Sequence, residues 1–182
     1  MVYMYKLKLT SLQQKIMHFF FVNAGKTFNA RELSMSIGVS QPAIAKAIPL
    51  LKSRDFINVS KDKKSKRLSI ELNRDNVLVI GMKRADNIGQ LYESGLTEFL
   101  REKFPGCAVI VFGSFAKGED THKSDIDIAV VGAKGKAVDL SGFEKIFMKE
   151  IRINFYKSFK EISKELKGNI LGGILLSGWI EL

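Results

Sequence analysis

The sequence predicts an α+β protein of two domains: a helical domain with a β-hairpin at residues 1–75, and an α/β domain with a small mixed sheet at residues 76–182. Three observations support this division. Apolar residues at helical spacing give way to strand-like alternation before residue 73. The first domain holds 14 Lys or Arg and 5 Asp or Glu, whereas the second holds 15 and 14. The second domain also contains a continuous apolar run, a Gly-Ser turn and two closely spaced aspartates.

The overall composition is that of a folded protein, with 46% hydrophobic and 26% charged residues. Most of the net charge of +10 lies in the first domain, which indicates a module that faces a polyanion. The single cysteine, Cys107, excludes an internal disulfide framework and a cysteine-based zinc site. No stretch approaches the ~20 apolar residues that cross a membrane, and the first residues lack the pattern of a signal peptide. We therefore expect a cytoplasmic protein with no membrane partner.

Two helices are expected at the start of the first domain. The stretch "LTSLQQKIMHFFFV" opens with a Thr/Ser cap and places Leu12, Ile16 and Phe20 on one face. The next stretch, "NARELSMSIG", has Asn29 as an N-cap, and Gly38 stands where a glycine ends a helix.

A third helix is expected to begin after Ser40, with Ile44, Ile48 and Leu51 as its buried stripe. Pro49 lies well inside this pattern, so we expect it to kink or shorten the helix. The stretches "INVS" and "KRLSIEL", joined by the turn "KDKKS", then predict a β-hairpin.

This order of helices and hairpin resembles the winged helix–turn–helix domains of bacterial and archaeal regulators. In such domains the second helix of the pair enters the major groove of DNA through its N-terminal residues, and the hairpin is the wing. The resemblance implies DNA contacts from the following residues: Ser40, Gln41, Ala43, Ile44 and Lys46 in the helix, and Lys63, Lys64, Lys66 and Arg67 in the wing. Winged helix proteins often bind DNA as dimers, so a homodimer is one expected assembly. The alternative is a solvated run of charge on a domain that binds protein.

In the second domain, the polar residues at 73–90 mark the expected boundary, and "IGQLYESGLTEFLREKF" predicts one amphipathic helix. "CAVIVF" predicts a strand buried on both faces. "SDIDIAVVG" and "KEIRINFY" predict two more strands, with a helix between them, and the remaining residues predict a closing helix and a short strand.

The chemistry is expected between the first two of these strands. Gly113 allows close approach of the backbone, and Ser114 adds a donor at the start of a short helix, an arrangement that attracts phosphate. Asp125 and Asp127 are two residues apart and therefore share one face of a strand. Two adjacent carboxylates repel unless a cation lies between them, and Mg²⁺ is the natural partner when phosphates supply its other ligands.

An apolar strand, Gly-Ser and the later S-D-I-D-I together resemble the signature of the DNA polymerase beta nucleotidyltransferase superfamily. Residues 85–182 are similar to its small members, the minimal nucleotidyltransferases of bacteria and archaea. The resemblance implies that the Gly-Ser turn holds the β- and γ-phosphates of a nucleoside triphosphate. It also implies that Asp125 and Asp127 bind a catalytic pair of Mg²⁺ or Mn²⁺ ions, and that Lys117 and Lys123 neutralise phosphate charge.

In such an enzyme a hydroxyl of the acceptor attacks the α-phosphorus and releases pyrophosphate. The acceptor would be a protein side chain or a nucleic-acid end. Minimal nucleotidyltransferases often occur as antitoxins beside a toxin, so a toxin-like protein is a further expected partner. The alternative is a transcriptional regulator whose catalytically inactive nucleotidyltransferase fold senses a nucleotide or a partner.

The third strand departs from the superfamily pattern. The superfamily usually has a third carboxylate there, but the alignment that buries Ile151 and Ile153 puts Arg152 at that position. Glu150, the candidate substitute in the catalytic set, comes two residues early, roughly 6.6 Å along the strand. We expect Arg152 to pair with the two aspartates and supply charge that a metal would otherwise provide. Turnover with Glu150 as substitute, nucleotide binding without turnover, and a structural role in assembly all remain open.

Overall fold

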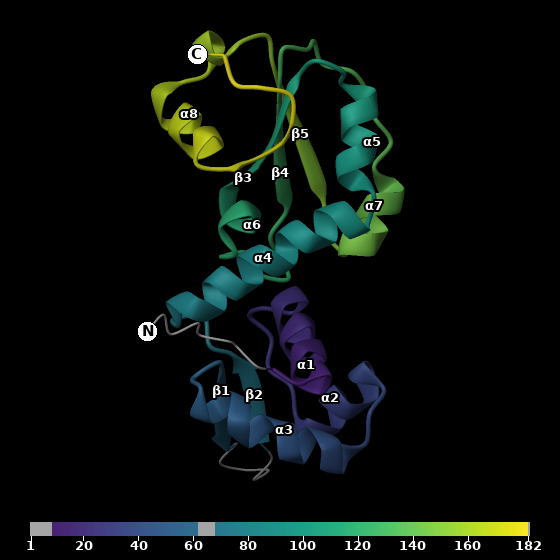
Figure 1. Cartoon of the computed structure of the whole chain (residues 1–182), viewed down its shortest axis with the longest axis vertical. Coiled ribbons are helices and arrows are strands. Elements are labelled where there is room, and N and C mark those ends of the chain that lie inside the picture. Colours follow the sequence, from purple (N-terminus) through teal and green to yellow (C-terminus); the bar gives the residue numbers. More distant parts are fainter. Residues whose placement is uncertain (1–8, 62–67, 182) are drawn as a thin grey trace, which may run out of the picture. The chain divides into compact units, whose positions relative to one another are not determined.

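The computed structural model describes residues 9–61 and 68–181, and the chain divides into two compact units, Met1–Val79 and Ile80–Leu182 (Figure 1). Both units combine helices with a small sheet, so the α+β class is confirmed. No helix in the described part of the chain is both long enough and apolar enough to span a membrane.

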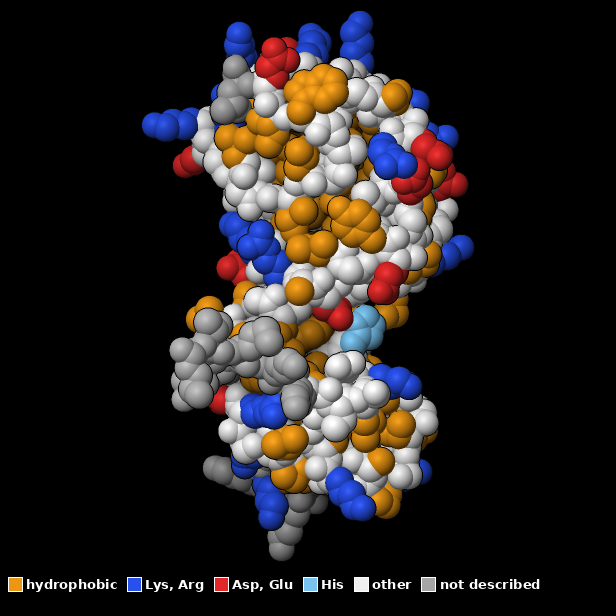
Figure 2. Space-filling model, in the orientation of Figure 1, with side chains coloured by type: hydrophobic (Ala, Val, Ile, Leu, Met, Phe, Trp, Pro, Cys, Tyr) orange, Lys and Arg blue, Asp and Glu red, His pale blue; other side chains and the backbone are white. Residues whose placement is uncertain are grey.

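The N-terminal unit has the winged-helix-like order that the sequence predicts. Its elements are α1 (Ser11–Val22), α2 (Ala30–Ile37), α3 (Gln41–Ser53) and the antiparallel hairpin of β1 (Ile57–Lys61) and β2 (Leu68–Leu72). Ile16, Leu33, Ile44 and Ile70 are fully buried and form the centre of its core. On the face seen in Figure 2, Lys and Arg side chains stand on the surface of this unit with few acidic side chains among them.

Local capping explains where these helices begin and end. The Asn29 side chain accepts hydrogen bonds from the backbone N–H groups of Arg31 and Glu32, and the Glu32 carboxylate accepts one from the Asn29 N–H. Gly38, with φ of 74°, ends α2 in the left-handed region. The Ser40 side chain accepts a hydrogen bond from the Ala43 N–H at the start of α3. All three predicted caps are confirmed.

The expected shortening of the third helix at Pro49 is wrong, because α3 continues to Ser53, and the expected kink stays a prediction. Proline removes the hydrogen bond to the carbonyl four residues earlier, which belongs to Ala45. Both Ala45 and Pro49 are exposed, so water can solvate that carbonyl at little cost.

The C-terminal unit is built on a four-stranded mixed sheet with the strand order β5-β4-β3-β6. The pair β4 and β5 is parallel, and the other two pairs are antiparallel. The elements are α4 (Val77–Glu93), which begins in the first unit, α5 (Leu96–Lys103), β3 (Ala108–Phe112), α6 (Gly113–Lys117), β4 (Ile126–Val131), α7 (Ser141–Phe147), β5 (Ile151–Tyr156), a 3₁₀ turn η1 (Phe159–Glu161), α8 (Lys164–Leu171) and β6 (Ile174–Ser177).

Helices cover both faces of this sheet (Figure 1). On one face, Val109 of β3 and Ile128 of β4 pack with residues of α4, α5 and α7. On the other face, Ile110 of β3 and Ala129 of β4 pack with residues of η1 and α8. Because side chains alternate along a strand, Asp127 lies on the second face.

The single helix predicted at the start of this domain is two helices. The chain leaves α4 after Glu93, and Gly95, with φ of 78°, precedes α5. The segment predicted as a boundary, 73–90, lies largely within α4. The Asn76 side chain accepts hydrogen bonds from the N–H groups of Leu78 and Val79, so this polar residue starts a helix.

Candidate functional site

The Gly-Ser turn and the acid pair lie at adjoining ends of β3 and β4. Phe112, the last residue of β3, pairs with Asp127 in the antiparallel register. Gly113 has φ of 74°, and a Cβ atom built on it would lie 3.0 Å from Asp127 Oδ2. The two sequence features are therefore in contact, and the contact depends on a glycine at this position.

The environment of Asp127 includes the charge of Asp125. Burial raises the pKa of the Asp127 carboxyl above its ordinary value, and the Asp125 carboxylate raises it further, while Arg152 acts in the opposite direction. Ile126 and Ile128 beside them are fully buried, as the strand alternation predicts. This end of β4 thus presents two close carboxylates, an arrangement that favours a nearby cation.

Arg152 supplies one such cation. It lies opposite Asp127 in the parallel register of β4 and β5, and its Nη1 atom is 2.5 Å from Asp125 Oδ2. Of the predicted pairing with both aspartates, the ion pair with Asp125 is confirmed, whereas the charge of Arg152 only partly opposes the rise that burial and Asp125 cause in the pKa of Asp127. The guanidinium also donates two hydrogen bonds to Glu150, from Nε to Oε1 (3.0 Å) and from Nη2 to Oε2 (3.1 Å). Arg152 therefore bridges Glu150 and the acid pair.

Three further residues are predicted to contact phosphate, and two of them, Lys117 and Lys123, are exposed. Ser114 is half-buried in the first turn of α6. Lys117, at the end of α6, donates a hydrogen bond from Nζ to Asn169 Oδ1 of α8 (3.2 Å). Lys123 is exposed in the loop before β4, and its backbone N–H donates to Thr121 Oγ1 (3.2 Å).

The donor set fits one divalent cation better than two. Asp125 and Asp127 are two carboxylates on one side of β4, which suits Mg²⁺ when phosphate oxygens and water complete its shell. Among residues 9–61 and 68–181, no group of three or more His, Cys, Asp or Glu side chains could hold a metal. Glu150 is directed to Arg152, so the side chains present do not reproduce the three-carboxylate arrangement.

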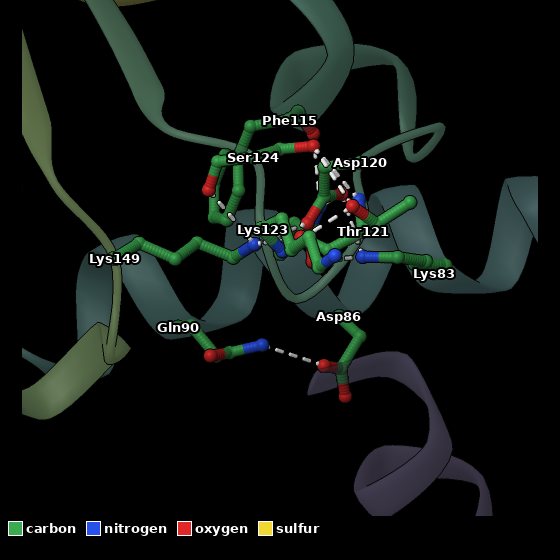
Figure 3. Close-up of polar contacts among 10 residues, drawn as sticks. Lys83, Asp86, Gln90, Phe115, Asp120, Thr121, Lys123, Ser124 and Lys149 are labelled. Atoms are coloured by element: carbon green, nitrogen blue, oxygen red, sulfur yellow. Dashed lines mark hydrogen bonds and ion pairs between the residues drawn. The ribbon is translucent and has the colours of Figure 1, made fainter. Parts of the chain in front are cut away.

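Sequence reasoning missed a buried charged cluster beside this site, shown in Figure 3. Asp120, in the loop between α6 and β4, forms ion pairs with Lys83 of α4 and with Lys149, which precedes β5. Asn87 of α4 donates a hydrogen bond to the same carboxylate. The four-residue spacing of Lys83 and Asn87 was the available signal, because it places both on one face of a helix.

The predicted DNA-contacting residues of α3 divide by exposure. Ser40, Gln41 and Lys46 are exposed, and Ala43 is half-buried. The prediction for Ile44 is wrong: its side chain is fully buried in the core of the N-terminal unit and cannot contact DNA. The predicted wing residues, Lys63, Lys64, Lys66 and Arg67, lie outside the residues that the structure describes.

One protein-family model matches part of the C-terminal unit. Residues 93–170 match the nucleotidyltransferase domain family. The matched segment includes the turn at Gly113, both aspartates and Arg152, whereas Lys83 and Asn87 precede it. No curated protein matches the chain.

Solved structures give partial similarities. The chain is similar to the adhesin competence repressor AdcR of Streptococcus pyogenes, with 22% identity over 54% of this chain and 70% of that chain and a TM-score of 0.42. For the zinc-responsive MarR family member ZitR of Lactococcus lactis the identity is 18%, over 54% of this chain and 65% of that chain, with a TM-score of 0.41. The identity to MepR of S. aureus, solved in a DNA complex, is 12% over 52% of this chain and 81% of that chain, and the TM-score is 0.38.

Proposed function

We propose that the C-terminal unit binds a nucleoside triphosphate with one divalent cation and transfers its nucleotidyl group to a hydroxyl acceptor. The observation that carries this proposal is the contact between the Gly113 backbone and the Asp127 carboxylate, within a segment that matches the nucleotidyltransferase domain family. In this proposal, the turn that binds phosphate lies beside the two aspartates that bind the cation.

Each residue then has a defined part in binding. The turn at Gly113 and Ser114 donates hydrogen bonds to the terminal phosphates. Asp125 and Asp127 hold the cation, which neutralises phosphate charge when bound. Lys117 and Lys123, both exposed at this end of the unit, offset the remaining negative charge.

A second function is favoured by a different observation, the ion pair between Arg152 and Asp125. Arg152 stands where the superfamily resemblance leads us to expect an acid that helps activate the acceptor hydroxyl. A guanidinium cannot accept a proton or bind a cation. The alternative is therefore a regulator whose C-terminal unit binds a nucleotide without turnover and whose N-terminal unit binds DNA.

DNA binding by the N-terminal unit is common to both proposals. The first turn of α3 is exposed at Ser40 and Gln41, and Lys46 is exposed one turn further. A helix that presents polar N-terminal residues after a turn suits the major groove. The excess of Lys and Arg in residues 1–75 suits the phosphate backbone.

Incubation with each α-labelled nucleoside triphosphate, Mg²⁺ or Mn²⁺ and a cell extract as the source of acceptors separates the two functions. Label on an acceptor that disappears with Asp125→Ala, but persists with the exposed-acid control Asp139→Ala, supports transfer. Nucleotide binding by equilibrium dialysis without any label supports the regulator instead. Absence of both binding and label rejects both proposals for this unit.

A further inference from the structure

Four buried polar side chains form a cluster centred on Asp120, here called the Asp120 cluster: Lys83, Asn87, Asp120 and Lys149 (Figure 3). Lys83 Nζ is 2.6 Å from Asp120 Oδ1, and Lys149 Nζ is 3.1 Å from Asp120 Oδ2, so one lysine meets each carboxylate oxygen. The side chains of Lys83 and Asp120 are each 1% exposed, and that of Lys149 is 5% exposed.

Burying these charges is a weak source of net stability for the fold. Moving an ion out of water costs several kcal/mol, and apolar replacements of buried ion pairs are often as stable as the pairs. Burial lowers the pKa of Lys83 below its ordinary value even though Asp120 acts in the opposite direction, so the ion pair only partly offsets the cost of desolvation. The contacts that the cluster makes with neighbouring segments indicate a role in geometry.

On one side the cluster contacts α6, the short helix that begins at Gly113 and Ser114. Asn87 Nδ2 donates hydrogen bonds to Asp120 Oδ1 (2.8 Å) and to the backbone carbonyl of Phe115 (2.9 Å). Phe115 follows Ser114 in α6, so Asn87 ties this short helix to α4 and to Asp120.

On the other side the cluster contacts the loop that leads to the acid pair. Lys149 Nζ donates hydrogen bonds to the backbone carbonyls of Thr121 and Ser124, the latter at 3.2 Å. Ser124 directly precedes Asp125, so Lys149 fixes the chain immediately before the first acid. One carboxylate is therefore linked, through two different side chains, to both ends of the segment that joins the turn to the acids.

Gly118 gives independent support, because it shows how closely this segment lies against α4. It ends α6 with φ of 77°, and a Cβ atom built on it would lie 2.5 Å from the Ile80 carbonyl oxygen and 2.7 Å from the Arg84 nitrogen. Only glycine permits this approach. The segment that starts at Gly118 therefore begins in direct contact with the helix that carries Lys83 and Asn87.

We propose that the Asp120 cluster sets the spacing between the Gly113–Ser114 turn and the Asp125–Asp127 pair, and that Asn87 and Lys149 are positioning residues for the nucleotide. This inference rests on the proposed nucleotide site. It extends beyond the family match, since Lys83 and Asn87 precede residue 93. Each positioning residue acts on one side of the site, so their losses have separate local signatures.

Amide hydrogen exchange followed by mass spectrometry tests the two sides separately in the full chain. Lys149→Met is expected to speed exchange in residues 121–125 and to leave residues 115–118 near the wild-type rate, whereas Asn87→Ala is expected to do the reverse. Lys149→Arg, which keeps the charge, is expected to restore slow exchange. Lys145→Met, an exposed lysine of α7, is the control and changes neither segment. A loss of stability alone would speed exchange in both segments together, and that result overturns the proposal.

Binding supplies the second readout, with fluorescent ATP and GTP analogues and Mg²⁺ as probes. Loss of an outer-shell partner of a metal site typically costs ~10- to 100-fold in affinity or activity, and we expect a loss in that range for Lys149→Met. Unchanged affinity together with unchanged exchange overturns the positioning role. If the wild-type chain binds no nucleotide, the proposed function fails, while the exchange comparison still decides whether the Asp120 cluster fixes the segment.

Discussion

Arg152 lies opposite Asp127 across the β4–β5 pair, and its guanidinium forms an ion pair with the neighbouring Asp125. Glu150 holds the same guanidinium from its other side through two hydrogen bonds. The hydrogen bonds to Glu150 and the charge of Asp125 raise the pKa of Arg152 above its ordinary value. The guanidinium is therefore positively charged at neutral pH. The acid pair therefore has a built-in counter-ion, which any divalent cation must displace or share.

Replacing this counter-ion by an acid should strengthen cation binding. For Arg152→Asp we expect the Kd for Mn²⁺ to fall about tenfold, because the change removes the cation paired with Asp125 and adds a third carboxylate beside the acid pair. Titration followed by electron paramagnetic resonance measures the affinity. Arg101→Asp is the matched control, since Arg101 is an exposed arginine of the same unit that pairs with Glu98. An unchanged Kd would show that Arg152 does not compete with the cation.

The acid pair could be predicted from the sequence because its geometry is local. Side-chain alternation alone places Asp125 and Asp127 together, and the alternation of Ile151 and Ile153 aligns Arg152 with them. Contacts between distant segments left a weaker signal, because the four-residue spacing of Lys83 and Asn87 suits one helix face but does not indicate their partner. The buried face of α4 carries Val79, Lys83, Asn87 and Leu91 at four-residue steps, but the two middle residues are polar.

The periodicity of apolar residues therefore does not reveal α4. Its two buried polar residues need Asp120 as a partner, and Asp120 lies more than thirty residues later in the sequence. Ile44 shows the opposite error. Its apolar side chain fits the buried stripe of α3, and a helix cannot direct one side chain both into the core and toward DNA.

Gly113→Ala should damage both the fold and the site. The substitution places a residue with a Cβ atom in the left-handed region, which costs roughly 1–2 kcal/mol, and it brings that atom to 3.0 Å from Asp127 Oδ2. We expect a lower urea midpoint and loss of nucleotide binding. Gly142→Ala in α7 is the control: apart from its chain neighbours and the backbone of its own helix, no atom lies within 4 Å of the added Cβ, and alanine in a helix is favoured over glycine by about 1 kcal/mol. Equal stability of the two variants would contradict the observed backbone geometry.

Asp127→Asn should stabilise the metal-free protein at neutral pH. The pKa of Asp127 is raised above 3.8, mainly by burial and then by Asp125, so the folded state holds its proton to higher pH than the unfolded state. Stability therefore falls as pH rises from 3.8 through the folded pKa. Urea denaturation in EDTA should show a more stable variant at pH 7 and a shrinking difference as the pH falls toward 3.8.

Asp139→Asn should behave in the opposite way. The hydrogen bond from the backbone N–H of Ser141 holds the pKa of Asp139 below 3.8 in the folded state. The charged carboxylate therefore stabilises the folded state above pH 3.8, and this contribution is lost as the pH falls through the pKa of the folded state. The variant should be the less stable protein at pH 7 and should approach the wild type in acid. If both asparagine variants are less stable than the wild type at pH 7, the electrostatic origin assigned to Asp127 is wrong; if both are more stable, the one assigned to Asp139 is wrong.

Duplex DNA binding by the N-terminal unit should weaken steeply with salt, because phosphate neutralisation releases counter-ions from the duplex. Fluorescence anisotropy with a random-sequence duplex, at salt concentrations from about 50 to 200 mM, gives the slope of log affinity against log salt. Lys46→Ala should reduce that slope by about 0.9 if Lys46 contacts a phosphate. Lys160→Ala, an exposed lysine of the other unit, should leave it unchanged. Binding that is undetectable or insensitive to salt would remove the DNA-binding role, since the basic excess in residues 1–75 would then have no polyanion partner of this kind.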